Sequence, residues 1–273
     1  MCGEETATID TPSSGAFFIR EGDHWLATEH GRGPWSPEHL HAGPPSALLA
    51  RAIQRAARDD PAQQVTRLTV ELMSPVPLAP LSVECSLLRA GRKSRRIEAT
   101  LRAGSRTLAR ATGLAIRTET LDLPAVARVP HPLPPPPEAG TPFRFPVFHS
   151  EGGYSAAVDA RLVQGGHGIN PTSVWIRARV PLVAGEETAP LERVMIAADS
   201  GNGIAVVLDP RRYSFVNADL TVYVHRLPVD EWVCLEAATT AEPSGVGLTA
   251  SRLYDRSGPI GWSLQGLLIE ARP

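Results

Sequence analysis

One carboxylate lies where the sequence pattern predicts an apolar side chain. In the segment MIAADSGNG, residues 195–203, an apolar run ends in Asp199 and the chain then breaks into Ser-Gly-Asn-Gly. On a helix, Leu191, Met195 and Asp199 share one face, because positions four apart stack on each other. Burying a carboxylate is costly unless it is paired or shifts its pKa. Asp199 is therefore the first candidate for acid–base chemistry, and a bond back to the N–H groups of residues 200–203 is the alternative.

A glycine and two prolines open another expected helix, in HAGPPSALLARAIQRAARDD, residues 41–60. Proline is tolerated in a first helical turn because the N–H groups there have no helical partner. The side chains expected on the buried side are Leu48, Leu49, Ala52, Ile53 and Ala56, and those expected to face away are Arg51, Arg55 and Arg58. The segment APLERVMIAAD, residues 189–199, repeats this design with Pro190 at its start.

Composition removes several classes of protein from consideration. A net charge of −2 gives no reason to expect nucleic acid or a membrane surface, and no apolar run approaches the length of a membrane span. The three cysteines, Cys2, Cys85 and Cys234, lie far apart, which fits a reducing cytoplasm. His39 and His41 have no further partner cluster with metal-site spacing. We therefore expect a cytoplasmic protein without a metal and without nucleic-acid or membrane partners.

A proline-rich segment divides the chain into halves of similar size. LPAVARVPHPLPPPPEAGTP, residues 123–142, can be neither a helix nor a central strand, because proline fixes φ and removes backbone donors. We expect an N-terminal domain over residues 14–120, a linker over 121–142 and a C-terminal domain over 143–273.

The two halves repeat one design at an offset of 152 residues, which pairs Thr69 in RLTVELMSPVPL with Thr221 in DLTVYVHRLPV. The same offset pairs Leu101 with Leu253, Leu108 with Ile260 and Ile116 with Leu268. A period this long indicates duplicated domains rather than a solenoid.

In each half the helix is followed by strands with alternating side chains. In SFVNADLTVYVHR, residues 214–226, alternation predicts one face with Val216, Ala218, Leu220, Val222 and Val224 and another with Phe215, Asn217, Asp219, Thr221, Tyr223 and His225. One long helix followed by several antiparallel strands, twice over, is an α+β pattern. It suits a sheet wrapped around a central helix.

Together these features resemble a known family. From about Gly15 to Arg272, the layout is similar to double hotdog proteins of the acyl-CoA thioesterase II type, particularly the thioesterase-like proteins of actinobacteria. The resemblance is carried by the two-copy architecture and by HAGPPSALLARA, AADSGNG, FVNADLTVYVHRLPVDEWVCLEAATTA and SRLYDRSGPIGWSLQGLLI. It implies an α+β fold of two tandem hotdog domains, each an antiparallel sheet wrapped around a long central helix.

The resemblance also implies an enzyme, an acyl-CoA thioesterase that hydrolyses fatty acyl-CoA. In the family, three side chains hold the water: an aspartate near the end of the second helix, a threonine in the next strand and a glutamine in the last strand. The aspartate falls on Asp199 and the glutamine on Gln265, whereas Asn217 stands in place of the threonine. The implied substrate is an acyl-CoA or acyl carrier thioester, with no cofactor besides the coenzyme A of the substrate. The implied assembly is a homodimer or larger homo-oligomer.

Divergence between the copies is a second reason to place the site in the C-terminal half. The residues that the first copy has opposite Asp199, Asn217 and Gln265 are Gln54, Val65 and Gly113. We therefore expect one site per chain. Asp199 would be the general base, or the acceptor that aims the water, while Asn217 and Gln265 fix its other hydrogen bonds. The alternatives are a solvated strand residue for Asn217 and a core amide for Gln265.

The first helix would supply the oxyanion donors, because its free N–H groups and macrodipole favour negative charge. Gly43 would let a thioester carbonyl approach, and Ser46 would keep an N–H available after the prolines. His41 is expected to line the entrance, while Arg92 and Lys93 would meet the phosphates of coenzyme A. Helix-start sequence for Gly43 and a solvated turn for the two basic residues are the alternatives.

Two other functions stay open at this point. An acyl-thioester hydratase or dehydratase needs an acid or base over the α-carbon, often histidine with aspartate, and His225 is the only histidine near the candidate strand. A non-catalytic acyl-CoA or lipid-binding module is the other possibility.

Overall fold

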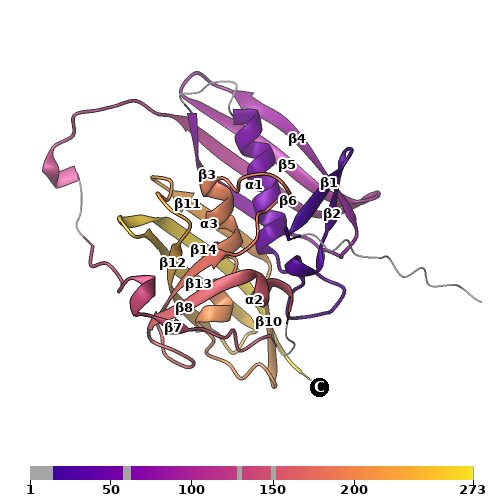
Figure 1. The fold of residues 1–273 in the computed structure, drawn as a ribbon, viewed down its shortest axis with the longest axis vertical. Coiled ribbons are helices and arrows are strands. Elements are labelled where there is room, and N and C mark those ends of the chain that lie inside the picture. The colour runs from indigo at the N-terminus through magenta and orange to yellow at the C-terminus, as the bar shows by residue number, and fades with distance from the viewer. Residues whose placement is uncertain (1–14, 58–62, 128–130, 149–151, 273) are drawn as a thin grey trace, which may run out of the picture.

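Two antiparallel half-sheets join edge to edge at the middle of the molecule, between β3 (Gln63–Leu72) and β11 (Asp219–Val224). The computed structural model describes residues 15–57, 63–127, 131–148 and 152–272. Its strands form one sheet in the order β1-β2-β4-β5-β6-β3-β11-β14-β13-β12-β9-β8-β7, with β10 paired to β14 (Figure 1). The prediction of an α+β double hotdog fold is confirmed by this sheet and by its two main helices, which have 15 and 9 residues.

The first half contains β1 (Phe18–Glu21), β2 (His24–Ala27), η1 (Glu29–Gly31), α1 (Gly43–Ala57), β3, β4 (Pro80–Ala90), β5 (Ser94–Ala103) and β6 (Arg106–Arg117). Two short turns of helix follow, η2 (Ala125–Ala127) and η3 (Pro137–Ala139). The second half contains β7 (Thr141–Pro142), α2 (Gly153–Ala157), β8 (Val158–Gln164), β9 (Thr172–Ala178), α3 (Pro190–Ala198), α4 (Gly201–Ile204), β10 (Tyr213–Asn217), β11, β12 (Val233–Ala241), β13 (Val246–Asp255) and β14 (Gly258–Ala271). The domain boundaries themselves stay a prediction.

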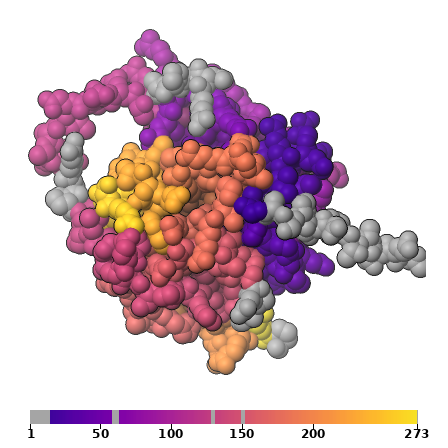
Figure 2. Space-filling model, viewed as in Figure 1, coloured from indigo at the N-terminus to yellow at the C-terminus, as the bar shows by residue number. Residues whose placement is uncertain are grey.

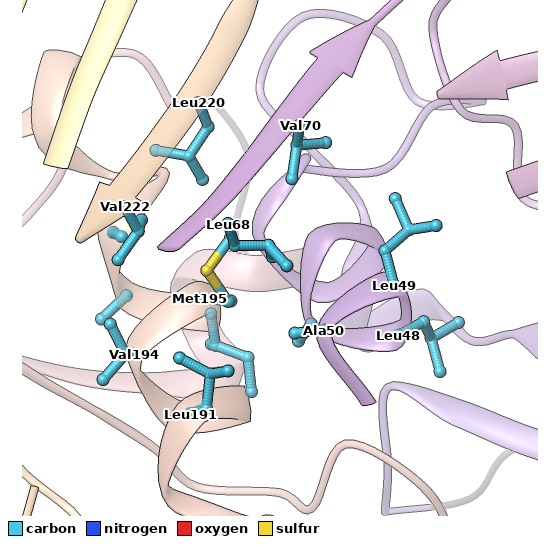
Figure 3. Packing of buried hydrophobic residues seen from close by; sticks show 14 of the residues in the cluster. Leu48, Leu49, Ala50, Leu68, Val70, Leu191, Val194, Met195, Leu220 and Val222 are labelled. Carbon is cyan, nitrogen blue, oxygen red and sulfur yellow. The ribbon is translucent and has the colours of Figure 1, made fainter. Parts of the chain in front are cut away.

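The helices α1 and α3 lie side by side over the central strands, and the core lies between them and the sheet (Figure 3). The side chains that meet there include Leu48, Leu49, Leu68, Val70, Leu191, Val194, Met195, Leu220 and Val222, all at most 1% exposed. Full burial of a side chain of this size contributes about 1.5–3 kcal/mol. This shared core holds the end of α3 against the start of α1.

The repeat is visible in the pairing of the sheet. Thr69 and Thr221 are direct partners on β3 and β11, and their Oγ1 atoms lie 3.3 Å apart. Equivalent residues can be direct partners only where the two copies meet around a local two-fold axis. The other aligned positions have matching burial, with Leu101 and Leu253 both at 0% and Leu108 and Ile260 both at 0% exposure. The predicted offset is confirmed by this arrangement.

The prediction of inner and outer faces for residues 214–226 is wrong for the first residues of this segment. Asn217 pairs with Leu267, but Thr221 pairs with Leu264. An advance of four residues along one strand therefore matches an advance of three along the other. The extra residue forms a bulge at Ala218 between β10 and β11, and it reverses the alternation. Phe215 therefore lies inside with Leu220 and Val222, whereas Val216 is exposed. Asn217 is carried to the inner side of the sheet.

Arg51 also differs from its expected position. Arg51 is only 6% exposed, and its guanidinium pairs with the buried Glu192 at 3.1 Å and with Glu186. The carboxylates come from α3 and the loop before it, so helix packing draws Arg51 inward. Arg55 is half exposed as expected, and Arg58 lies outside the described residues.

The linker both leaves and returns to the body of the molecule. Figure 2 shows its first part as an arm that stands away from the rest of the molecule. Its later part is anchored on the second half, where Trp175 Nε1 donates to the carbonyl of Pro135 at 2.7 Å and Arg256 pairs with Glu138. This anchoring leads the chain into the segment of residues 143–148. Among the described residues, no helix is long and apolar enough to cross a membrane.

Candidate active site

A cavity of about 280 Å³ opens where the end of α3 meets the start of α1. Its walls come from β10, from the loop after β3 and from residues 145–148, which follow the linker. The lining side chains are mostly apolar and include Trp35, Leu40, Leu72, Met73, Val76, Phe145, Val147, Phe148 and Val216. Its polar lining includes His41, Asp199, Ser200, Asn202 and Asn217.

Asp199 is the residue that ends α3, and it is only 3% exposed. Asn217 Nδ2 donates to its Oδ1 at 2.7 Å, and His41 Nδ1 lies 3.1 Å from its Oδ2. Both carboxylate oxygens are therefore engaged by side chains from other elements. The alternative of a bond to the N–H groups of residues 200–203 has no support in the described structure. A buried carboxylate held in this way on a cavity wall is arranged for chemistry.

Asn217 lies beside Asp199 because of the bulge at Ala218. Its amide nitrogen faces the carboxylate, since only the nitrogen can donate to it. Its Oδ1 is buried and has no hydrogen-bond partner in the part of the chain that the structure describes. A buried acceptor of this kind is usually satisfied by a bound water. The prediction that Asp199 and Asn217 meet agrees with this geometry.

Gln265 contacts the backbone of Asp199, on the side away from the cavity. Its Nε2 donates to the backbone carbonyl of Asp199 at 3.0 Å, and its Oε1 accepts from the N–H of Asn202 at 3.1 Å. Gln265 is fully buried and does not line the cavity. It holds the turn between α3 and α4, so the expectation that it touches the water is not met. The core amide of the alternative describes its contacts better.

The structure also differs from the prediction for the oxyanion donors at Gly43 and Ser46. The Ser46 N–H donates to the carbonyl of Ala42 at 3.0 Å, so it is not available. The Gly43 N–H points at His41 Nδ1 at 3.2 Å. A Cβ on Gly43 would lie 2.5 Å from the carbonyl oxygen of Ile196, so glycine is needed there for the approach of α1 to α3. The Ala42 N–H has no partner among the described residues, and Ala42 lines the cavity.

His41 does more than line an entrance. Its ring stacks on Tyr154 with centroids 3.7 Å apart and planes 3° from parallel. The Tyr154 hydroxyl donates to the carbonyl of Ile196 and shares a hydrogen bond with Ser200, both at 2.8 Å. Burial lowers the pKa of His41, although the Asp199 carboxylate opposes this shift. Sequence reasoning missed Tyr154, because no periodic pattern links α2 to the start of α1.

Arg92 and Lys93 lie away from the cavity. They form the turn after β4. The first residues of β4 lie near the cavity, because Pro77, just before the strand, bridges to the cavity-lining His39. Eleven residues of extended strand span roughly 33 Å, so the turn is at the opposite end of the sheet. Neither residue lines the cavity. The solvated turn of the alternative fits this position.

The equivalent place in the first copy is closed. A side chain at Gly113, the counterpart of Gln265, would collide with the Cγ2 of Ile53 from α1. The counterpart of Asn217 is the buried Val65. Apolar packing therefore replaces the polar group, and the expectation of one site in the chain agrees with it.

Solved structures with the same fold cover nearly all of the chain. A TesB protein of Mycobacterium avium subspecies paratuberculosis is similar over 94% of this chain and 96% of its own, with 16% identity and a TM-score of 0.65. A hot dog fold protein of unknown function from Alicyclobacillus acidocaldarius has 17% identity, a TM-score of 0.70 and coverage of 94% and 96%. The acyl-CoA thioesterase II TesB2 of Mycobacterium marinum has 16% identity, a TM-score of 0.66 and coverage of 92% and 94%. Among curated proteins, no match was found.

Family models identify both halves. Residues 31–116 match the acyl-CoA thioesterase N-terminal domain, and residues 130–269 match the acyl-CoA thioesterase C-terminal domain. These two matches cover most of the chain, and the second one begins within the proline-rich segment. The protein therefore belongs to the acyl-CoA thioesterase family and has its double hotdog architecture.

Proposed function

We propose that this protein hydrolyses fatty acyl-CoA thioesters in the cavity between α1 and α3, with a water activated at Asp199. One observation carries the proposal: the Asp199 carboxylate, held by the Asn217 amide and flanked by His41, lies on the wall of a mostly apolar cavity. A water held beside this carboxylate has an oxygen lone pair free to attack a carbonyl carbon. Membership of the family supports thioester hydrolysis as the reaction.

The oxyanion would form at the start of α1. Among the described residues, no backbone carbonyl accepts the N–H groups of Ala42 and Gly43, of which the Gly43 N–H faces His41 Nδ1, and prolines follow them. Donors fixed before the reaction stabilise the developing charge without reorganisation. Gln265 would contribute by holding the Asp199 backbone, without touching the substrate.

The apolar walls would hold the acyl chain. Phe145 and Phe148 pack with ring centroids 5.9 Å apart on one side, and Met73 and Val76 lie on another. Such a lining favours an acyl group over a charged one, and burial of each methylene is worth about 0.8 kcal/mol. This supports fatty acyl thioesters as the substrate class.

Hydration of an enoyl thioester is the second candidate, and one observation favours it. The pair of His41 and Asp199, whose nearest atoms are 3.1 Å apart, provides the histidine and aspartate that such a reaction uses. His225, the histidine considered from sequence, is exposed at the end of β11 and does not line the cavity.

Thiol release tests the proposal directly. Purified protein would be assayed on saturated acyl-CoAs of graded chain length, on an acyl carrier thioester and on an enoyl-CoA. We expect thiol release from acyl-CoA by the wild type and its loss in Asp199→Asn. Asp209→Asn is the matched control, since Asp209 pairs with Arg211 on the surface. Loss of enoyl absorbance without thiol would favour hydration, and binding without either change would favour a binding module.

We also propose that two copies of the chain associate through the outer face of the sheet. The support is a group of exposed apolar side chains on β11, β13 and β14, namely Tyr223, Val246, Leu248, Trp262, Leu264 and Leu268. Several are direct neighbours, since Tyr223 pairs with Trp262 and Val246 with Leu268. A contiguous exposed apolar surface of this kind is typical of an interaction site.

A further inference from the structure

His41 occupies a position that links the carboxylate to the cavity. Its Nδ1 lies 3.1 Å from Asp199 Oδ2 and 3.2 Å from the Gly43 N–H, and its ring is held flat against Tyr154. His41 also lines the cavity. No group in the described residues bonds its other nitrogen, Nε2.

The contacts of Nδ1 decide where the ring carries its hydrogen. A single nitrogen cannot both donate to Asp199 and accept from Gly43, because it has either a hydrogen or a lone pair in the ring plane. An ionised carboxylate oxygen next to Nδ1 requires the hydrogen there. Neutral His41 then has its lone pair on Nε2, and the Gly43 N–H is left without an acceptor. This tautomer thus leaves a lone pair on Nε2 that can act as a base.

We propose that His41 is the proton acceptor of this site and that Asp199 fixes its tautomer and orientation. This inference rests on the proposed thioester hydrolysis. As the water oxygen bonds to the thioester carbon, one of its hydrogens passes to His41 Nε2. The carbon–sulfur bond then breaks, and the same proton passes to the departing thiolate. The products are the carboxylic acid and free coenzyme A, and His41 is neutral again.

The surroundings suit a neutral base. Burial lowers the pKa of His41 below its ordinary value, with Asp199 opposing the shift, so the imidazole is neutral near pH 7. Stacking on Tyr154 fixes the ring plane, and Tyr154 is itself held by Ile196 and Ser200.

Few other titratable groups bear on His41. The described elements bring Asp199 from α3 and Tyr154 from α2 against it, while His39 on its own segment lines the same cavity. Burial raises the pKa of Tyr154, so its phenol stays neutral throughout the working range. The acidic limb of a pH profile is therefore assigned to His41.

Two amide variants separate proton transfer from positioning. In His41→Asn the side-chain nitrogen can replace Nδ1 as donor to Asp199, but no base remains. In His41→Gln the nitrogen lies nearer the place of Nε2. We expect both variants to lose about 100-fold or more in kcat, as for removal of a general base. His225→Asn, at an exposed position outside the cavity, is the matched control and should keep full activity. Melting temperatures check that each variant folds.

The pH profile of kcat/KM completes the test. In the wild type we expect activity to fall as the pH drops through the pKa of His41, below about 6.5. Asp199→Asn removes the carboxylate that raises the pKa of His41. The acidic limb of the pH profile of this variant's residual activity should therefore move to lower pH. An active His41→Asn with the wild-type limb would overturn the inference and leave the proposed function intact. A wild type that releases no thiol from any acyl-CoA would overturn both.

Discussion

Asn217 Nδ2 donates to Asp199 Oδ1 at 2.7 Å, and the buried Asn217 Oδ1 has no partner among the described residues. Removing this amide in Asn217→Ala should lower kcat about 10- to 100-fold, because a hydrogen bond to a charged group is worth about 1.5–3 kcal/mol. Asn217→Thr restores the family's residue, whose hydroxyl can donate and accept, and should keep most of the activity. Steady-state kinetics of both variants on one acyl-CoA provide the measurement. Equal rates in the alanine variant and the wild type would contradict the assigned role.

Gln265 should behave as a stabilising residue whose loss also disturbs the site. Gln265→Leu leaves the Asn202 N–H buried and unpaired, and it leaves the Asp199 carbonyl with only the longer bond from Asn217 Nδ2 at 3.4 Å, at a cost of about 1–3 kcal/mol each. We expect a free energy of unfolding lower by about 2–5 kcal/mol in urea denaturation, together with a lower kcat. Gln164→Leu changes an exposed glutamine on β8 and should leave both quantities nearly unchanged. An inactive Gln265→Leu variant of full stability would instead favour direct contact with the water.

Much of this arrangement could be predicted from the residues, because the pattern that predicts it is local. Helical periodicity placed Asp199 at the buried end of α3, and the repeat aligned Thr69 with Thr221, which are partners in the sheet. The family resemblance added Asn217 and Gln265 to the candidate site.

What the sequence could not provide depends on register and on distant contacts. Alternation cannot reveal a bulge, so the reversal at Ala218 was missed, and with it the inward position of Phe215. Helical periodicity puts Arg51 on the polar side of its helix, and only the pairing with Glu192 of α3 draws it inward. The contact between His41 and Tyr154 joins segments more than 100 residues apart, and no spacing rule connects them.

Gly43 should tolerate no side chain. The Cβ of Gly43→Ala would lie 2.5 Å from the carbonyl oxygen of Ile196 and 3.1 Å from His41 Nδ1, so α1 and α3 must separate. Overpacking of this kind costs about 1–3 kcal/mol. We expect a lower melting temperature and a loss of thiol release. Gly203→Ala, where the added carbon would meet Phe145 at an ordinary 3.6 Å, is the control for stability. A Gly43→Ala variant as stable and active as the wild type would show that the two helices can move apart freely.

The outer face of the sheet gives a prediction about assembly. Trp262 and Leu264 are 45% and 39% exposed on β14, in the middle of the apolar group. Replacing both with glutamate should convert an associated protein into single chains, because charge on the shared face is repeated in both copies. Light scattering after size exclusion would measure the mass, with Val229→Glu as a control at an exposed loop position. A wild type of single-chain mass would refute the proposed association.

Asp255 should make the free energy of unfolding depend on pH in the acidic range. Burial raises the pKa of Asp255, but hydrogen bonds from Arg226 and from the N–H groups of Val229 and Ser257 outweigh burial and hold it below its ordinary value. The unfolded chain therefore takes up the proton first as the pH falls. The stabilisation is complete above the unfolded pKa of about 3.9 and is lost as the pH falls through the lower folded pKa.

Asp255→Asn removes one partner of this pair and should lower the free energy of unfolding at pH 7 by about 2–3 kcal/mol, somewhat less than for a fully buried pair because Arg226 is partly exposed. Urea denaturation from pH 7 to pH 3 is the measurement, and the difference between the variant and the wild type should shrink only below about pH 4. Asp209→Asn breaks a similar pair on the surface and should leave stability unchanged, since water screens that pair. A difference for Asp255→Asn that stays constant down to pH 3 would mean that packing, and not charge, makes Asp255 stabilising.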